Sequence, residues 1–378
     1  MTWLSAAEAM SRLKIRPQTL YAYVSRGRVE ARPDPADPRR SLYSAEDVSA
    51  LTARRGRSRK LSAVAQDAIA WGEPVLSSAL TTVTRGRLYY RGRDAIALSE
   101  RATLEEAAEL FWSAPYAASA APSAPDEGGV RARLFAALAA RAGEARSALG
   151  RPKALLAEEA ALVLETMVEA VAGQAAGAPI HERLARFWAL DARGADIVRR
   201  ALVLLMDHEL NASTFAVRVT ASTGASLAAC ALTGLATLSG PLHGAAVRSV
   251  MKFATEGARL GAHAAVRARL DENLMIPGFG HNLYPEGDPR AVSLLDAMHA
   301  GEEIRALCAA VRAEAGLEAN VDLAMAAMAL ELGIGEDVFA IFAIGRAVGW
   351  MGHAIEQLES GSLIRPRARY VGAAPEMD

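Results

Sequence analysis

Aromatic residues are scarce in this chain of 378 residues, of which 52% are hydrophobic and only 6% are Phe, Trp or Tyr. Alternating strand-like runs are almost absent outside residues 29–43. Alanine is abundant instead, and an alanine-rich chain interrupted by glycines is typical of closely packed helices. The length suffices for one large domain or two to three smaller ones. We therefore expect a mainly α-helical protein.

Cysteines, metal-binding spacings and phosphate loops are also few or missing. The two cysteines, Cys230 and Cys308, lie in apolar helical stretches, which indicates buried thiols in a reducing compartment. No cysteine–histidine spacing is typical of zinc, and no glycine-rich loop is typical of a nucleotide-hydrolysing enzyme. We expect no bound metal.

No secretory signal opens the chain, because the first five residues lead straight into a charged amphipathic segment. Residues 221–242 carry no charge, but they are rich in Ala, Gly, Ser and Thr and end at Gly-Pro. That composition favours a buried helix over a membrane span. The expectation is a cytoplasmic protein with no membrane partner.

Charge is distributed unevenly along the chain. Residues 1–60 contain 13 Lys or Arg against 6 Asp or Glu, a net charge of +7, so the remainder carries −8 of the total of −1. The chain therefore has a basic head followed by an acidic body, a marked asymmetry of charge.

The basic head has the pattern of a small helical domain with a β-wing. A capping box, Ser5 to Glu8, predicts a first helix, Pro17 and Gly27 predict the limits of a second, and residues 29–43 predict a wing before a third helix. Residues 1–55 resemble the winged helix-turn-helix domains of excisionases and mercury-resistance regulators. By that resemblance DNA is a possible partner, and the residues on or near the recognition helix and the wing would be Arg16, Gln18, Thr19, Tyr21, Tyr23, Arg39 and Arg40. The alternative is that this domain serves only in dimerisation or docking.

Three segments of the body could carry chemistry. Gly240–Gly244 and Gly278–Tyr284 each place a histidine beside glycines, where imidazole and backbone can approach a ligand closely. Asn320–Asp322 places a carboxylate before an apolar run. Two histidines and one carboxylate could remove a proton from carbon and polarise two carbonyl groups, as a condensation through an enol requires.

The same segments resemble the citrate synthase family, and five further motifs occur with them in the family's order between about Leu76 and Gly372. They are Tyr89-Tyr90-Arg91-Gly92, Asp207-His208-Glu209 with Asn211 and Ser213-Thr214, Asp288-Pro289-Arg290-Ala291, and the arginine motifs around Arg346 and Arg365. The resemblance implies an all-α homodimer with a two-domain helical fold. Its large domain would comprise residues 76–244 and 331–378, its small domain residues 245–330, and residues 56–75 would link it to the head.

The resemblance also implies the catalytic residues. Asp322 would be the base that removes a proton from the acyl thioester, His243 would donate to the thioester carbonyl, and His281 would polarise the carbonyl of a 2-oxo acid. A carboxylate beside an apolar run is expected to lose solvent and gain basicity. Taken alone, Asp322 is more typical of a helix N-cap than of a base, and His243 is more typical of a structural turn residue.

By the same resemblance, Arg290, Arg346 and His208 would bind oxaloacetate, and Arg365 would reach the site of the other subunit. A surface ion pair is the ordinary alternative for each arginine. The coenzyme A thioester would be a substrate, with no bound cofactor. Its contacts would be Ile276, Pro277, Gly278, Phe279, Gly280 and Asn320.

Two departures from the family pattern concern coenzyme A. In the first, Pro285-Glu286 stands where the family usually has a basic residue, and Asn282 replaces an arginine. In the second, His243-Gly244-Ala245-Ala246-Val247 stands where the family has His-Gly-Gly-Ala-Asn. An acidic side chain near a phosphate would weaken binding. Citrate synthesis from acetyl-coenzyme A, 2-methylcitrate synthesis from propionyl-coenzyme A, and a DNA-binding regulator with a ligand-sensing body therefore all stay open.

Overall fold

A computed structural model of the chain describes residues 3–13, 20, 24, 29–34, 37–49, 76–117, 128–174, 177–368 and 370–373. The chain divides into two compact units, Met1–Ser77 and Ser78–Asp378. Each unit has its own hydrophobic core and is described by itself.

The first unit contains a short helix and a three-stranded antiparallel sheet with the strand order β1-β3-β2. The predicted capping box is present, since Ser5 N donates to Glu8 Oε2 (2.8 Å) and Glu8 N donates to Ser5 Oγ (3.3 Å). The predicted first helix and wing are thus observed as elements. Their bounds are β1 Trp3–Leu4, α1 Ala6–Leu13, β2 Ala31–Asp34 and β3 Asp37–Ser44.

DNA binding by this unit stays a prediction. Arg39 and Arg40 lie in β3. The other candidate contacts, Arg16, Gln18, Thr19, Tyr21 and Tyr23, lie outside the described residues, as does the proposed linker, residues 56–75.

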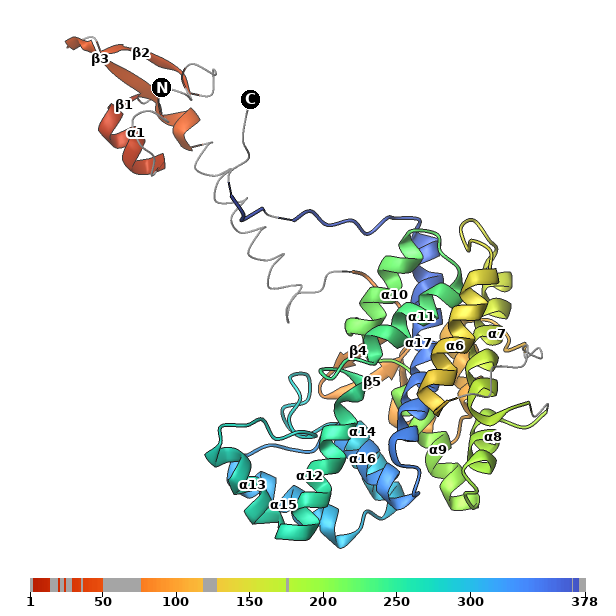
Figure 1. Cartoon of the computed structure of the whole chain (residues 1–378). Coiled ribbons are helices and arrows are strands. Elements are labelled where there is room, and N and C mark those ends of the chain that lie inside the picture. The colour runs from red at the N-terminus through yellow and green to blue at the C-terminus, as the bar shows by residue number, and fades with distance from the viewer. Residues whose placement is uncertain are drawn as a thin grey trace. The chain divides into compact units, whose positions relative to one another are not determined.

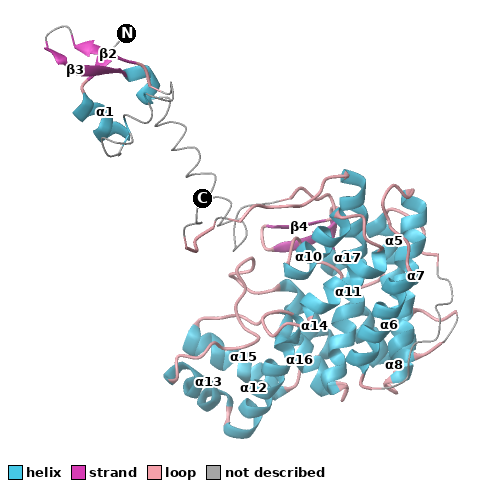
Figure 2. Cartoon of the chain, turned by 45° about the horizontal axis from the view of Figure 1, so that its top comes forward, coloured by secondary structure: helices cyan, strands magenta, loops and turns pink. Residues whose placement is uncertain are grey.

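The second unit is built almost entirely of helices, which confirms the mainly α-helical fold (Figures 1 and 2). A small sheet, β4-β5-β6, precedes them. The bounds are β4 Thr81–Thr84, β5 Arg87–Tyr90, β6 Arg93–Asp94, α4 Ala95–Ser99, α5 Leu104–Trp112, α6 Val130–Glu144, α7 Lys153–Ala172, α8 Ile180–Phe187, α9 Ala192–Leu205, α10 Ala212–Ser222, α11 Leu227–Leu238, η1 Gly244–Ala246, α12 Val247–Leu260, α13 Ala262–Asp271, α14 Pro289–Met298, α15 Glu302–Ala315, α16 Val321–Glu331, η2 Gly335–Asp337 and α17 Val338–Ser360.

The charge-free stretch 221–242 forms two elements rather than one helix. α10 ends at Ser222 and α11 begins after its cap Ser226, because Gly224 between them has a φ of +80°, which ends a right-handed helix. α11 is largely buried, as the composition predicts.

Helix α17 is the centre of the core and packs against α5, α7, α9, α10 and α11. Within the described residues, the stretch Gly335–Ser360 alone is long and apolar enough to cross a membrane, and its apolar window is entirely buried inside the protein. Small residues allow this close packing: a Cβ at Gly352 would lie 2.6 Å from the Phe111 ring, and one at Gly234 would lie 2.6 Å from the Trp350 ring.

Helices α12 to α16 gather at one end of the second unit, and both views show α12, α13 and α15 together there. The chain enters this group just after His243 and returns through η2 to α17. The three chemistry-bearing segments therefore lie where the helix group meets the core around α17.

Candidate active site

The glycine-rich loop 276–280 is joined to the start of α16 by backbone hydrogen bonds. Gly280 N donates to Glu318 O (2.8 Å), and Asn320 N donates to Gly278 O (3.0 Å). Gly278 has a φ of +85°, and a Cβ there would lie 2.7 Å from Val250 Cγ1. The predicted coenzyme A loop is thereby brought beside the predicted base.

Asp322 is not the cap of its helix. Asn320 is the N-cap of α16 and its Oδ1 accepts from Asp322 N (3.0 Å), while its Nδ2 donates to Gly280 O (3.1 Å). The N-cap interpretation of Asp322 is therefore wrong, and its carboxylate is not used to cap the helix. Burial raises the pKa of this half-buried carboxyl group to about 6, despite the opposing Arg290 charge.

His208 and His281 lie together with Tyr284. The imidazole centroids are 5.1 Å apart, and His208 Nε2 is 3.0 Å from the Tyr284 hydroxyl oxygen. Leu283 N donates to His281 Nδ1 (3.1 Å), so the neutral His281 ring carries its proton on Nε2. Burial, then the Arg290 charge, lowers the pKa of both histidines, well below the ordinary range for His208. Neutral imidazoles that donate from nitrogen suit the polarisation of a carbonyl group.

His243 is held by Ser213, whose role the sequence did not reveal. His243 Nε2 lies 3.0 Å from Ser213 Oγ, which accepts from Trp350 Nε1 (3.0 Å) and donates to Asn211 Oδ1 (2.8 Å). Serine has one proton to donate. In the described geometry that proton goes to Asn211 Oδ1, so His243 Nε2 carries the ring proton and donates it to Ser213 Oγ. If the hydroxyl rotates from Asn211 to His243 Nε2, the neutral ring carries its proton on Nδ1 and can donate it elsewhere. Burial, then Arg346, lowers the pKa of His243 to about 4, which keeps the ring neutral near pH 7.

Arg290 is buried and paired, rather than being an unpaired cation waiting for a ligand. Its Nε and one terminal nitrogen donate to Asp288 at 3.0 and 2.7 Å, and both side chains are at most 3% exposed. Although burial acts against the charge, Asp288 raises the pKa of Arg290 above its ordinary value. Asp288 also accepts from Val321 N (3.1 Å), one residue before Asp322.

Arg346 is the second buried guanidinium, with 2% of its surface exposed. Its Nε donates to Leu205 O (2.8 Å). Burial lowers the pKa of Arg346 to about 10, while the Asp207 carboxylate opposes the shift, so the group stays charged near pH 7. Arg290 and Arg346 are both close enough to Asp322 to lower its pKa.

The structure thus brings together His208, His243, His281, Arg290, Asp322 and Arg346. Arg365 is not among them: it is exposed and follows Ile364, whose N donates to Ser222 Oγ at the end of α10 (3.1 Å). Within the described residues, no group of three or more His, Cys, Asp or Glu side chains is placed to hold a metal ion. The roles of Ser213, Trp350 and Asp288 were not indicated by the sequence. These roles depend on partners distant in the sequence or on burial.

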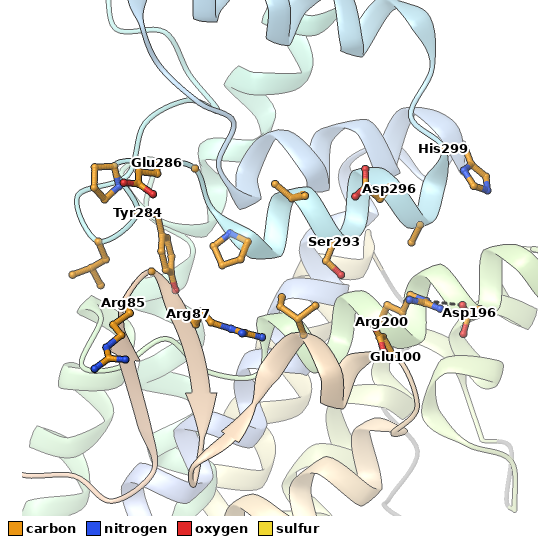
Figure 3. Close-up of a pocket in the computed structure, with 18 residues that line it drawn as sticks. Arg85, Arg87, Glu100, Asp196, Arg200, Tyr284, Glu286, Ser293, Asp296 and His299 are labelled. Carbon is orange, nitrogen blue, oxygen red and sulfur yellow. Dashed lines mark hydrogen bonds and ion pairs between the residues drawn. The ribbon is translucent and has the colours of Figure 1, made fainter.

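A cavity of about 1140 Å³ lies beside this cluster and is lined in part by Tyr284, whose ring lies against His208 and His281. Figure 3 shows Arg85 and Arg87 of the β4–β5 hairpin on one wall, with Tyr284 and Glu286 opposite. Asp322 and His243 do not line it. Glu286, which departs from the family pattern, therefore lines the cavity next to the cluster.

Comparison with known proteins identifies the lineage of the chain. The sequence profile of "Citrate synthase, C-terminal domain" matches residues 130–367, well over half of the chain. The protein belongs to the citrate synthase family. Citrate synthase 2 of Bacillus subtilis is 41% identical over 186 residues, which are 46% of this chain and 50% of that protein. 2-Methylcitrate synthase 2 of Corynebacterium glutamicum is 36% identical over 186 residues, 46% and 48% of the two chains.

Solved structures of citrate synthases match a longer part of the chain. Citrate synthase from Thermotoga maritima superposes with a TM-score of 0.66 at 26% identity, over 81% of this chain and 96% of that one. A Thermoplasma acidophilum citrate synthase, solved with carboxymethyl coenzyme A and oxaloacetate, matches with a TM-score of 0.66 at 25% identity, over 82% and 97%. In sequence, however, the chain spans about half the length of the curated relatives that it matches.

Proposed function

We propose that the protein condenses acetyl-coenzyme A with oxaloacetate and hydrolyses the product to citrate and coenzyme A. The observation that carries the proposal is Asp322, a carboxyl group of raised pKa that does not cap its helix and lies near two buried arginines. In this reaction the thioester is a substrate, and no metal or bound cofactor takes part.

Asp322 takes a proton from the acetyl methyl group. The Ser213 hydroxyl turns from Asn211 to His243 Nε2, and His243 donates from Nδ1 to the thioester oxygen as the enol forms. Supporting these roles are the ionised carboxylate of Asp322 near pH 7 and the neutral His243 ring on Ser213. His281 donates from Nε2 to the carbonyl of oxaloacetate, which makes that carbon electrophilic. Arg290 and Arg346 bind the carboxylates, and guanidinium groups suit them because they can donate two parallel hydrogen bonds.

Domain closure is the remaining part of the proposal. Residues 245–330 would move as the small domain against residues 76–244 and 331–378, excluding water while the enol forms and admitting it for hydrolysis. Loop 276–280, together with Asn320, would hold the coenzyme A moiety of the thioester.

A release assay tests the proposal directly. Purified protein with oxaloacetate and acetyl-coenzyme A should liberate free thiol, and propionyl-coenzyme A should be tried beside it. 2-Methylcitrate synthesis is the second candidate, favoured by the Corynebacterium glutamicum relative. Thiol release that is faster from the propionyl thioester would select it, and no release from either thioester would refute both.

Coenzyme A is expected to bind weakly, because Glu286 stands where the family usually has a basic residue that contacts a coenzyme A phosphate. Glu286→Lys should lower the KM for the thioester at least threefold and leave the KM for oxaloacetate unchanged, since the substitution replaces repulsion with attraction. Initial rates at varied thioester concentration measure this. Glu303→Lys, at an exposed site on α15, is the control. An unchanged or raised KM would show that phosphate is held elsewhere.

Arg365 is expected to complete the site of a partner subunit, because it is exposed and lies apart from the clustered residues of its own chain. Inactive Arg365→Ala and inactive His281→Ala subunits, when mixed, should regain partial activity through hybrid dimers. Mass spectrometry of differently tagged subunits establishes that exchange has occurred. Exchange without recovery would contradict a shared site.

A further inference from the structure

A buried acid–histidine pair lies directly behind the clustered residues. Asp207 and His353 are 0% and 1% exposed, and His353 Nε2 is 3.1 Å from Asp207 Oδ2. Thr81 Oγ1 donates to the same carboxylate oxygen at 2.5 Å. Both groups are far from solvent, so each depends on the other for its hydrogen bonding.

Three residues of helix α17 each hold one of the three successive residues that precede His208. Arg346 Nε donates to Leu205 O (2.8 Å), Gly349 N donates to Met206 O (3.2 Å), and His353 pairs with Asp207. Positions 346, 349 and 353 lie on one face of a helix. A Cβ at Gly349 would lie 2.7 Å from Asp207 Oδ1, so only glycine permits this approach without displacement.

The β4–β5 hairpin holds the same segment from the opposite end of the sequence. The Tyr90 hydroxyl donates to Leu204 O (3.0 Å) and Asp207 O (3.2 Å), and Val83 N donates to Glu209 Oε1 (2.7 Å). Glu209 has a φ of +50°, an uncommon conformation for a residue other than glycine. His208 therefore sits in a backbone held on both sides, with its ring against Tyr284.

Two polar atoms of the pair have no hydrogen-bond partner in the part of the chain that the structure describes, Asp207 Oδ1 and His353 Nδ1. Such atoms are costly in a core and call for an explanation. The Glu356 Oε2 atom lies 3.9 Å from His353 Nδ1, beyond hydrogen-bond distance. Asp207 is adjacent to His208 in the chain, and His353 lies on the same face of α17 as Arg346. This placement gives a functional reason for the buried pair.

We propose that His353 is a positioning residue of the oxo-acid site, which orders His208 and Arg346 by donating a hydrogen bond to Asp207. This inference rests on the proposed function in that oxaloacetate is the ligand those two side chains bind. His353 itself touches no substrate. Without its donor, the buried Asp207 carboxylate turns, and the backbone that carries His208 shifts with it.

Two variants at His353 separate the donor from the shape of the ring. His353→Leu removes the donor and is expected to raise the KM and the calorimetric Kd for oxaloacetate at least tenfold, with the KM for the thioester within twofold. His353→Gln keeps an N–H that can reach Asp207 and should stay within threefold of the unaltered protein. His263→Leu is the matched control, since exposed His263 also pairs with a carboxylate, that of Glu314, at 3.0 Å.

A substrate-free measurement keeps this proposal distinct from the proposed function. Diethyl pyrocarbonate should modify His208, which is 8% exposed, at least fivefold faster in His353→Leu than in the unaltered protein or His353→Gln. If the unaltered protein neither binds oxaloacetate nor releases thiol, the proposed function fails. The difference in labelling rate between His353→Leu and the unaltered protein still tests whether His353 positions His208.

Three outcomes overturn the positioning role: unchanged oxaloacetate affinity and labelling in His353→Leu, equal losses in His353→Leu and His353→Gln, or a parallel rise in the thioester KM. If His353→Leu does not fold, Thr81→Val removes the other donor to the same carboxylate. A selective loss of oxaloacetate affinity in Thr81→Val supports the proposal, and unchanged affinity contradicts it.

Discussion

Replacing Asp322 by Asn is expected to lower kcat about 10³-fold, or roughly 4 kcal/mol of barrier, because general base catalysis contributes factors of about 10² to 10⁴. The amide keeps the shape of the side chain but cannot take a proton from carbon. Thiol release at saturating substrates measures the effect. Asp271→Asn, at an exposed end of α13, should leave kcat unchanged.

The raised pKa of Asp322, to about 6, makes two pH predictions. The base is the ionised form, so kcat should fall as pH drops through about 6. The folded state also binds this proton more tightly than the unfolded chain does, so stability decreases as pH rises from the ordinary aspartate pKa toward 6. Asp322→Asn should therefore unfold at a higher temperature than the unaltered protein at pH 7. A loss of kcat below tenfold would contradict the role of Asp322 as base.

Replacing Asp288 by Asn is expected to destabilise the protein by about 3–5 kcal/mol, the usual cost of leaving a buried charge unpaired. Asp288 accepts two hydrogen bonds from the Arg290 guanidinium and others from the backbone of Arg290 and Val321. An amide offers a single acceptor oxygen and places N–H groups against the guanidinium. Urea unfolding at pH 7 measures the change, with Asp296→Asn on the exposed face of the same helix as control.

The pH dependence of this pair has the opposite sign to that of Asp322. Burial opposes ionisation, but Arg290 outweighs it and holds the pKa of Asp288 below its ordinary value. The contribution of Asp288 to the free energy of unfolding is therefore complete above its pKa in the unfolded chain, near 3.8. It is lost as the pH falls through the lower pKa of Asp288 in the folded protein. The unaltered protein should lose stability in acid more steeply than Asp288→Asn. Because Arg290 is released, the KM for oxaloacetate should also rise; equal stability of the two proteins at pH 7 would contradict the pairing.

Local patterns in the sequence predicted much of the fold. Alanine abundance and the lack of alternating runs indicated packed helices, and the capping box at Ser5 and Glu8 and the turns around residues 29–43 predicted α1 and the β2–β3 wing. These features depend on neighbours a few residues apart, where side-chain and backbone geometry act directly. A charge-free run alone could not reveal the break between α10 and α11, since that depends on the left-handed conformation of Gly224.

Resemblance to a family marked the candidate site residues, whereas local context alone favoured a helix cap over a base for Asp322. The tertiary structure excluded the cap, because Asn320 occupies that position and is itself bonded to the loop 40 residues earlier. It also decided the state of each charge. The pKa of Asp322 rises because folding removes its water, whereas that of Asp288 falls because folding brings Arg290 onto it.

The contacts that support the site were beyond the reach of the sequence. Ser213 meets His243 from 30 residues away, and His353 meets Asp207 from 146 residues away. Residue type and spacing determined that histidines, arginines and a carboxylate would be available in a helical protein. Which of them are neutral, paired or held in place was decided only by packing, because desolvation and hydrogen bonding depend on what surrounds each group in three dimensions.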